Sequence, residues 1–205
     1  GGMDDLRAGI IRCVGNAQAR FSEDALRILR GIRFAAQLGF ELEDETREGM
    51  RLLAPTLRKI SAERIQVELV KTLTSSRPDL LREAWKLGIT KEFLPEFDLA
   101  METTQETVHH MYTVGEHILH TLLKVRPDRI LRLTMLLHDI GKPYMKTMDA
   151  DGVAHFKGHP EKSSELANEI LHRLKFDNDT IRKVTKLVRY HDHRMPVTPA
   201  HVRRA

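Results

Sequence analysis

The sequence predicts an all-α protein made of two consecutive helical domains. Apolar residues recur at helical spacing along nearly every segment, and capping residues and glycines delimit these runs. Residues 144–158 depart from this pattern, and they favour either a small β-hairpin or a loop. With 205 residues, 41% of them hydrophobic and 30% charged, the chain is long and apolar enough to build a folded core.

Composition excludes several classes of protein. No apolar run approaches the roughly 20 residues that span a bilayer, and no basic segment followed by an apolar one resembles a secretion signal. Cys13 is the single cysteine, so an internal disulfide and a zinc ribbon are both excluded. We therefore expect a cytoplasmic protein without a membrane partner.

The first half reads as four helices. The first begins at Ser22, whose side chain suits an N-cap, with Glu23 and Asp24 in the first turn, and it ends at Gly39. The others are predicted over residues 44–57, 61–73 and 78–88.

A polar stretch without clear period, residues 95–108, predicts a boundary, and we divide the chain into domains 1–100 and 101–205. Helices are then expected over residues 112–124, 128–138, 160–174 and 179–191, with a last helix beginning near Pro199. The turn of the expected hairpin is Asp149 to Gly152.

Charge and histidine content also separate the two halves. Residues 1–108 carry 16 Lys and Arg against 18 Asp and Glu, whereas residues 109–205 carry 17 against 11. All 11 histidines lie at or after position 109. This sorting predicts two modules with different chemistry.

Five side chains of the second half are placed like metal ligands. His138 and Asp139 follow a strongly apolar helix, so they are expected at its buried end, where a bound cation would offset the cost of burying a charge. His117, His159 and His191 fall on an inward face or at an end of other helices. The alternative is a surface pair or a helix cap at residues 138–139. Without thiolates, the set suits manganese, iron, nickel, cobalt or magnesium.

Six other histidines have no such placement, and we expect them on the surface or around the site: His109, His110, His120, His155, His172 and His193. Of these, His110 and His193 are the next candidates for the site on position alone.

The motifs Tyr112-x-Val114-x-Glu116-His117 and Leu136-Leu137-His138-Asp139-Ile140-Gly141-Lys142 resemble the HD superfamily of metal-dependent phosphohydrolases. The resemblance implies that His117, His138 and Asp139 are metal ligands and that His159 and His191 complete a site for one or two ions. Lys142 is then a candidate phosphate contact, against the alternative of a solvated lysine. The family's further aspartate has no obvious counterpart, Asp192 being the nearest in sequence.

Asp24 and Arg27 open a second hypothesis. On one continuous helix they would share a face, either as an ion pair or as a carboxylate and guanidinium that bind the edge of a base. In the second case Arg30 and Arg33 would face phosphate or RNA.

The first half also resembles the neck of class II tRNA nucleotidyltransferases, which include CCA-adding enzymes and bacterial poly(A) polymerases. The matching residues are Arg20-Phe21-x-Glu23-Asp24-x-Leu26-Arg27-Ile28-Leu29-Arg30-x-Ile32-Arg33 and Ser61-x-Glu63-Arg64-Ile65-x-x-Glu68-Leu69-x-Lys71. The resemblance implies that Asp24 and Arg27, with Arg30, contact the nucleotide and select CTP and then ATP. Glu63 and Arg64 would support them, and the partner would be the 3′ end of tRNA or another RNA.

The family's polymerising chemistry uses a head domain in which paired aspartates bind magnesium after a glycine-serine turn. Only Asp149-Ala150-Asp151 has that spacing here, and it lacks the flanking motif, so we interpret it as the hairpin turn. We therefore expect a fragment with no catalytic residue for nucleotide addition.

Two other functions stay open on the sequence. One is a free-standing HD phosphohydrolase acting on nucleotides or 2′,3′-cyclic phosphates. The other is a non-catalytic scaffold for tRNA, with basic side chains on the phosphates: Arg126, Arg129, Arg132, Lys183, Lys186 and Arg189. The sequence leaves the oligomeric state undetermined.

Overall fold

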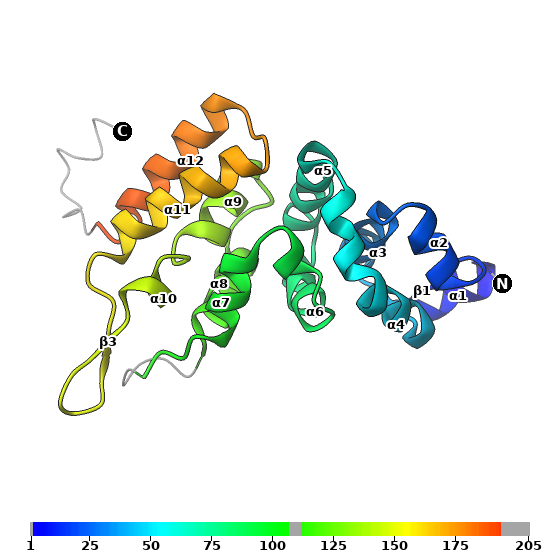
Figure 1. Ribbon diagram of the computed structural model, residues 1–205, viewed down its shortest axis with the longest axis horizontal. Helices are drawn as coiled ribbons and strands as arrows, with labels where there is room; N and C mark the ends of the chain where they lie inside the picture. Colours follow the sequence, from blue (N-terminus) through cyan, green and yellow to red (C-terminus); the bar gives the residue numbers. More distant parts are fainter. Residues whose placement is uncertain (1, 107–111, 194–205) are drawn as a thin grey trace.

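A computed structural model describes residues 2–106 and 112–193, and it confirms the all-α fold. The helices follow one another along an elongated molecule, with the N-terminus at one end and α10, α11 and α12 at the other (Figure 1). The expectations for His109, His110 and a helix near Pro199 lie outside the described residues.

The first half is built from short helices and one small parallel strand pair. Residues 10 and 11 pair with residues 41 and 42. The elements in order are α1 (Gly2–Ala8), β1 (Ile10–Ile11), α2 (Ala17–Glu23), α3 (Leu26–Leu38), β2 (Glu41–Leu42), α4 (Asp44–Leu53), α5 (Ala62–Leu73), α6 (Leu81–Lys86) and α7 (Pro95–Glu102), with 3-10 turns at Ala54–Lys59, Pro78–Leu80 and Thr90–Glu92.

The prediction of one helix beginning at Ser22 is wrong. Asn16 is the N-cap of α2, its side chain accepting a hydrogen bond from the Ala19 amide at 2.9 Å. The backbone is extended at Asp24, and the Asp24 carboxylate accepts a hydrogen bond from the Leu26 amide at 3.1 Å. Because this side chain satisfies an amide at the start of α3, it favours a break between two helices over a continuous one. Gly39 ends α3 in the left-handed conformation, as predicted.

Two further boundaries differ from the prediction. The helix from Asp44 ends at Leu53, and a 3-10 turn that contains Pro55 follows it. The polar stretch from residue 95 begins with helix α7, which buries Phe97, Ala100 and Met101 and packs on α8. The helix is so short that its few apolar side chains show no clear period in the sequence. Its formation depends on packing against α8.

The second half contains the predicted helices and hairpin. Its elements are α8 (Val114–Lys124), α9 (Arg129–Leu137), α10 (Lys142–Met145), β3 (Thr147–Met148), β4 (Ala154–His155), α11 (His159–Arg173) and α12 (Asn178–Tyr190). Strands β3 and β4 pair antiparallel. The Asp149 side chain accepts hydrogen bonds from the amides of Asp151 and Val153, so this segment is the hairpin turn, as predicted.

One hydrophobic core runs through both halves, from Ala17 to Val188. Helix α5 packs on α9, where the buried Arg132 donates a hydrogen bond to the Leu73 carbonyl at 3.1 Å. The suggestion that Arg132 is a surface phosphate contact is therefore wrong. The division at residues 100 and 101 remains a prediction, and α7 runs across that point. Within residues 2–106 and 112–193, no helix has the length and apolar character to cross a bilayer.

Candidate metal centre

The centre forms where α9 ends against α11. The buried side chains of Leu133, Leu136 and Leu137 fix α9 in the core, which places His138 and Asp139 at its buried end, as predicted. A Cβ on Gly141 would lie 2.5 Å from the Ser163 backbone nitrogen, so only glycine permits this approach of α11. The Gly141 amide also donates a 2.9 Å hydrogen bond to Ser163 Oγ.

Five side chains from four helices or helix ends converge on this point. His117 of α8 joins His138 and Asp139 in one group, and His159 and His191 join Asp139 in a second. In each group, one donor atom per residue lies within 4.8 Å of the others. Asp139 belongs to both groups, so its carboxylate links two adjoining sets of ligands. The structure thus brings together all five of the ligands proposed from sequence.

The imidazoles are oriented by their outer nitrogens. Nδ1 of His138, His159 and His191 lies 2.8, 2.9 and 2.6 Å from the carbonyl oxygens of Met135, Phe156 and Val188 respectively. A carbonyl oxygen only accepts, so each Nδ1 carries a proton, and in a neutral ring Nε2 then presents its lone pair. This backbone support is typical of histidines that bind metal through Nε2.

The inner nitrogens face one another. His138 Nε2 lies 3.4 Å from His117 Nε2, and His159 Nε2 lies 3.3 Å from His191 Nε2. His159 and His191, as neutral rings with Nδ1 protonated, cannot hydrogen-bond to each other through Nε2, because neither nitrogen there has a proton to donate. A cation between them removes that conflict.

Asp139 is the negative charge at the centre. Burial alone would raise the pKa of Asp139, but the imidazoles of His138, His159 and His191 lower the pKa well below its ordinary value. Its Oδ1 is buried and accepts no hydrogen bond from the described residues, although His159 Nε2 and His191 Nε2 lie 3.2 and 3.4 Å away. An orphaned buried oxygen surrounded by nitrogen lone pairs fits a divalent cation.

Lys142 lies beside the other carboxylate oxygen. Its Nζ is 2.8 Å from Asp139 Oδ2 and donates a hydrogen bond to Gln105 Oε1 at 3.2 Å. Lys142 also lines a pocket of about 600 Å³ together with Phe156, Lys157 and His159. The pocket gives a ligand of moderate size a route to the centre and to a half-buried ammonium group.

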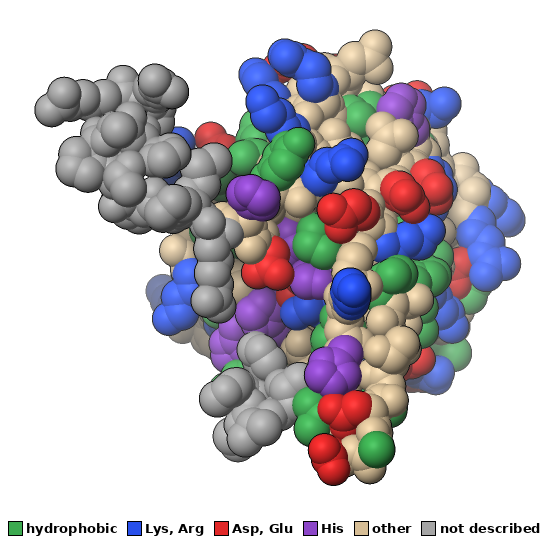
Figure 2. Space-filling model, turned by 90° about the vertical axis from the view of Figure 1, so that its left-hand side faces the viewer, with side chains coloured by type: hydrophobic (Ala, Val, Ile, Leu, Met, Phe, Trp, Pro, Cys, Tyr) green, Lys and Arg blue, Asp and Glu red, His purple; other side chains and the backbone are tan. Residues whose placement is uncertain are grey.

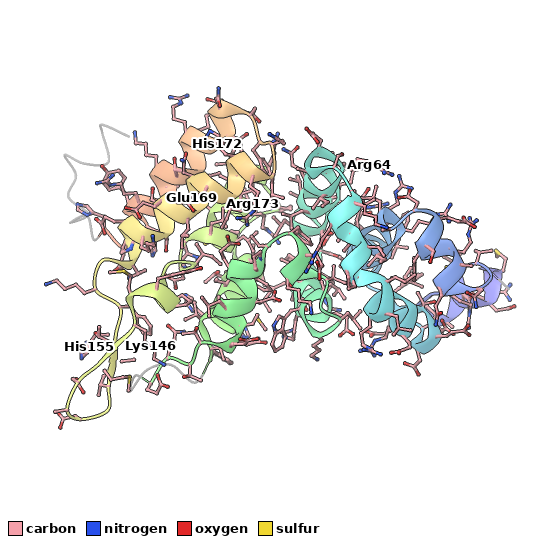
Figure 3. The ribbon with its side chains drawn as sticks, viewed as in Figure 1. Arg64, Lys146, His155, Glu169, His172 and Arg173 are labelled. Atoms are coloured by element: carbon pink, nitrogen blue, oxygen red, sulfur yellow. The ribbon has the colours of Figure 1, made fainter. Side chains whose placement is uncertain are left out.

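Sequence reasoning missed the residues that support this pocket. Gln105 is buried and bonds Lys142, but it lies in the polar stretch interpreted as a boundary. Beside it, Glu106 pairs with Lys146 at 2.6 Å, and this contact lowers the pKa of Glu106 to about 2. Lys146 and His155 lie at the base of the hairpin (Figure 3). The amide of Ala154 donates to the Glu106 carbonyl at 2.8 Å, which joins hairpin and stretch.

The end of the molecule that carries the centre shows histidine side chains gathered beside acidic and basic ones (Figure 2). Histidines outside the ligand set are exposed: His120, His155, His172 and His193. His155 pairs with Asp149 at 2.7 Å, and the ring of His193 stacks edge-on with Tyr190. Their positions therefore add no ligand to the two groups.

The proposed base-selecting residues lie at the junction of α2 and α3. Arg27 does not pair with Asp24: its Nη1 lies 2.6 Å from Glu23 Oε2 and 2.8 Å from the Arg20 carbonyl oxygen. Asp24 Oδ2 instead accepts a hydrogen bond from Arg64 at 3.0 Å. Burial raises the pKa of Asp24, but the Leu26 amide and Arg64 outweigh it and lower the pKa below its ordinary value.

The next two arginines of α3 turn toward α5. Arg33 Nε bonds the buried Glu68 at 2.5 Å, and Arg30 Nε lies 3.7 Å from the same carboxylate. Arg64 supports Asp24 directly, whereas the exposed Glu63 makes no side-chain hydrogen bond or ion pair in the part of the chain that the structure describes. The sequence motif contains Glu68 but assigns it no role. Its role as a counter-ion for Arg33 follows from the packing of α3 on α5.

Two family profiles match the chain. Residues 39–101 match the "probable RNA and SrmB-binding site of polymerase A", and residues 107–204 match the HD domain. The chain is therefore similar to a polymerase-type RNA-binding region followed by an HD domain, and the all-helical fold and the His-Asp cluster agree with both matches.

Known relatives make the family more specific. An A-adding tRNA nucleotidyltransferase of Deinococcus radiodurans is 36% identical and covers 100% of this chain and 49% of its own length. A CC-adding tRNA nucleotidyltransferase of Thermus thermophilus is also 36% identical, over 94% of this chain and 46% of its own. The chain is thus similar over its whole length to tRNA nucleotidyltransferases, and it spans about half the length of these curated relatives.

A solved structure has the same fold. "The structure of CCA-adding enzyme apo form I" superposes with a TM-score of 0.53 at 20% identity, over 93% of this chain and 40% of that one.

Proposed function

We propose that this chain is the base-selecting and HD portion of a cytoplasmic enzyme that adds nucleotides to the 3′ end of tRNA. The observation that carries the proposal is the similarity of the whole chain to an A-adding tRNA nucleotidyltransferase. CTP and ATP would be the nucleotides, and magnesium would serve the head domain of the whole enzyme. The whole enzyme would add A, CC or CCA to the tRNA end, and the proposal covers each of these three specificities.

In this function the junction of α2 and α3 would contact the base. A carboxylate accepts hydrogen bonds and a guanidinium donates them, so Asp24 and Arg27 together can match the mixed edge of cytosine or adenine. Arg64 and the Leu26 amide hold Asp24, and Glu23 holds Arg27. Both polar groups are thereby fixed before a nucleotide binds, which reduces the ordering cost of binding.

The test is nucleotide preference in the full-length enzyme. Arg27→Ala should reduce the preference for CTP over UTP by about tenfold, the value of one or two lost hydrogen bonds, with normal helix content by circular dichroism. Arg20→Ala is the matched control, since Arg20 contacts the same Glu23 carboxylate at 2.8 Å. An unchanged preference in Arg27→Ala would sink the base-selecting role.

The five-ligand cluster supports a second activity, metal-dependent phosphohydrolysis of nucleotides or 2′,3′-cyclic phosphates. His117, His138, Asp139, His159 and His191 would hold one or two divalent ions: manganese, nickel, iron, cobalt or magnesium. Such an ion polarises a phosphoryl oxygen and makes water a stronger nucleophile near neutral pH. In the reaction a water oxygen joins phosphorus and the ester oxygen leaves with a proton. Lys142 would hold a phosphoryl oxygen as the charge on it grows.

Metal content is the direct test of this activity. The purified chain, never exposed to chelator, should contain about one or two ions, and His138→Ala should lose them. His172→Ala, which removes an exposed histidine, is the control and should keep the metal. Hydrolysis of bis(p-nitrophenyl) phosphate should follow the metal content. A wild-type chain without stoichiometric metal would contradict the activity and favour a non-catalytic RNA scaffold.

A further inference from the structure

One face of α12 combines basic and apolar side chains that the proposed hydrolysis does not use. Lys183, Lys186, Leu187 and Tyr190 follow one another at spacings of three, one and three residues, so they lie along one side of the helix. Leu187 is 43% exposed and Tyr190 is 54% exposed. A large aliphatic side chain and an aromatic ring are thus exposed to solvent next to two lysines.

This face forms one wall of a groove that adjoins the metal centre. The groove has a volume of about 770 Å³ and is lined by the four side chains named above, by Ile130 of α9, and by His191 and His193. His191 is also one of the five candidate ligands. The groove and the metal centre therefore share a side chain, and a molecule lying in the groove would contact His191.

The charges of the groove suit a polyanion. Lys186 makes no ion pair with any residue in the ranges 2–106 and 112–193, and Arg189 on the same helix makes none either. Lys183 pairs with Asp179 at 2.6 Å, so its charge is partly compensated. Unpaired cations beside an exposed aromatic ring are the combination that binds single-stranded nucleic acid, where bases stack and phosphates pair with basic side chains.

The length of the face indicates a strand. From Lys183 to His191 the helix rises about 12 Å, room for roughly three nucleotides stacked about 3.4 Å apart. A mononucleotide at the metal centre would leave most of the groove unused.

We propose that the α12 groove binds single-stranded RNA and presents its end to the metal centre. The substrate class of the proposed phosphohydrolase, on which this inference rests, is then an RNA strand of several nucleotides with a terminal phosphate ester.

Binding is the first test, because it does not depend on hydrolysis. The probe is a 5′-fluorescein-labelled single-stranded RNA of eight nucleotides, titrated with the chain and followed by fluorescence anisotropy. Tyr190→Ala should weaken binding about tenfold through loss of a stack, and Tyr190→Phe should bind like wild type. Lys186→Ala should lower the slope of log affinity against log salt by about one. Leu187→Glu should also weaken binding, by introducing a negative charge into the groove at a residue that is not a metal ligand.

Arg182→Ala is the matched control. It removes one positive charge from the same helix, but Arg182 pairs with Asp179 at 2.6 Å and does not line the groove. Wild-type affinity in Tyr190→Ala and Leu187→Glu, or an equal loss in Arg182→Ala, would overturn the proposal. If the groove binds no RNA, its exposed apolar side chains indicate a protein partner instead.

A second measurement separates this proposal from the phosphohydrolase itself. Metal content and hydrolysis of bis(p-nitrophenyl) phosphate should be unchanged in Leu187→Glu, while hydrolysis of an RNA with a 2′,3′-cyclic phosphate end falls about tenfold. If the small ester is hydrolysed and RNA length has no effect, the activity stands and the groove proposal fails. If no metal binds, the phosphohydrolase fails, and the proposal that the groove presents RNA to it fails with it.

Discussion

The two halves of the molecule differ in what surrounds a buried carboxylate. Between α3 and α5, the buried Glu68 is matched by Arg33 and faces Arg30, so its charge is balanced within the protein. At the end of α9, Asp139 pairs with Lys142 through Oδ2, but four imidazoles also surround it, and its buried Oδ1 lacks a hydrogen bond from any described residue. A carboxylate matched only by guanidinium groups indicates a structural role, whereas one surrounded by several imidazole lone pairs indicates a ligand set.

The largest expected effect is on the balanced pair. Glu68→Gln leaves the Arg33 guanidinium, which is 12% exposed, without its carboxylate. Breaking such a pair costs about 3 kcal/mol of unfolding free energy, and the cost should be the same with and without added metal. Urea denaturation followed by circular dichroism measures it. Arg51→Ala, which breaks an exposed pair with Glu48, should cost less than about 1 kcal/mol.

Added metal should stabilise the protein only through the ligand cluster around Asp139. At about a hundredfold excess over its dissociation constant, a divalent ion adds about 2.7 kcal/mol to the unfolding free energy. The gain should disappear in Asp139→Asn and persist in Glu68→Gln. A metal-dependent rise in Tm that survives in Asp139→Asn would show that the ion binds elsewhere.

The increase in Tm caused by metal should be smaller at acid pH. Burial lowers the pKa of His191, but Asp139 and the Val188 carbonyl outweigh it and raise the pKa above 6.5 in the metal-free protein. A raised pKa stabilises the metal-free fold below about pH 6.5, and this contribution is lost as pH rises through the folded-state pKa. Protonation also removes a ligand lone pair. The Tm increase caused by metal should therefore grow between pH 6 and pH 8, and a constant increase would exclude His191 as a ligand.

The smallest effect is expected at Arg64. Its ion pair with Asp24 is partly exposed, so Arg64→Ala should lower the unfolding free energy by less than about 1 kcal/mol. If Arg64 positions the Asp24 carboxylate, the same variant in the full-length enzyme should nevertheless reduce CTP-over-UTP preference several-fold. Glu63→Ala, at an exposed neighbouring position, is the control.

The sequence by itself determined the helical class, the end of one helix at Gly39 and the candidate metal ligands. Helical periodicity and the glycine at position 39 are local signals, and a His-Asp pair after an apolar helix is expected at its buried end. For the helices and their ends, neighbouring residues contain most of the physical reason, whereas the packing of separate helices brings the ligands together.

Tertiary structure decided the break at Asp24, the helix from Pro95 and the pairing of charges. Asp24 interacts with Arg64, 40 residues away, and Lys142 interacts with Gln105, 37 residues away. Spacing along one helix predicted an Asp24–Arg27 contact, but a competing carboxylate at Glu23 and a competing guanidinium at Arg64 replaced it. Which of several possible ion pairs forms depends on which helices pack together, and only the assembled core of α3, α5 and α9 fixes that choice.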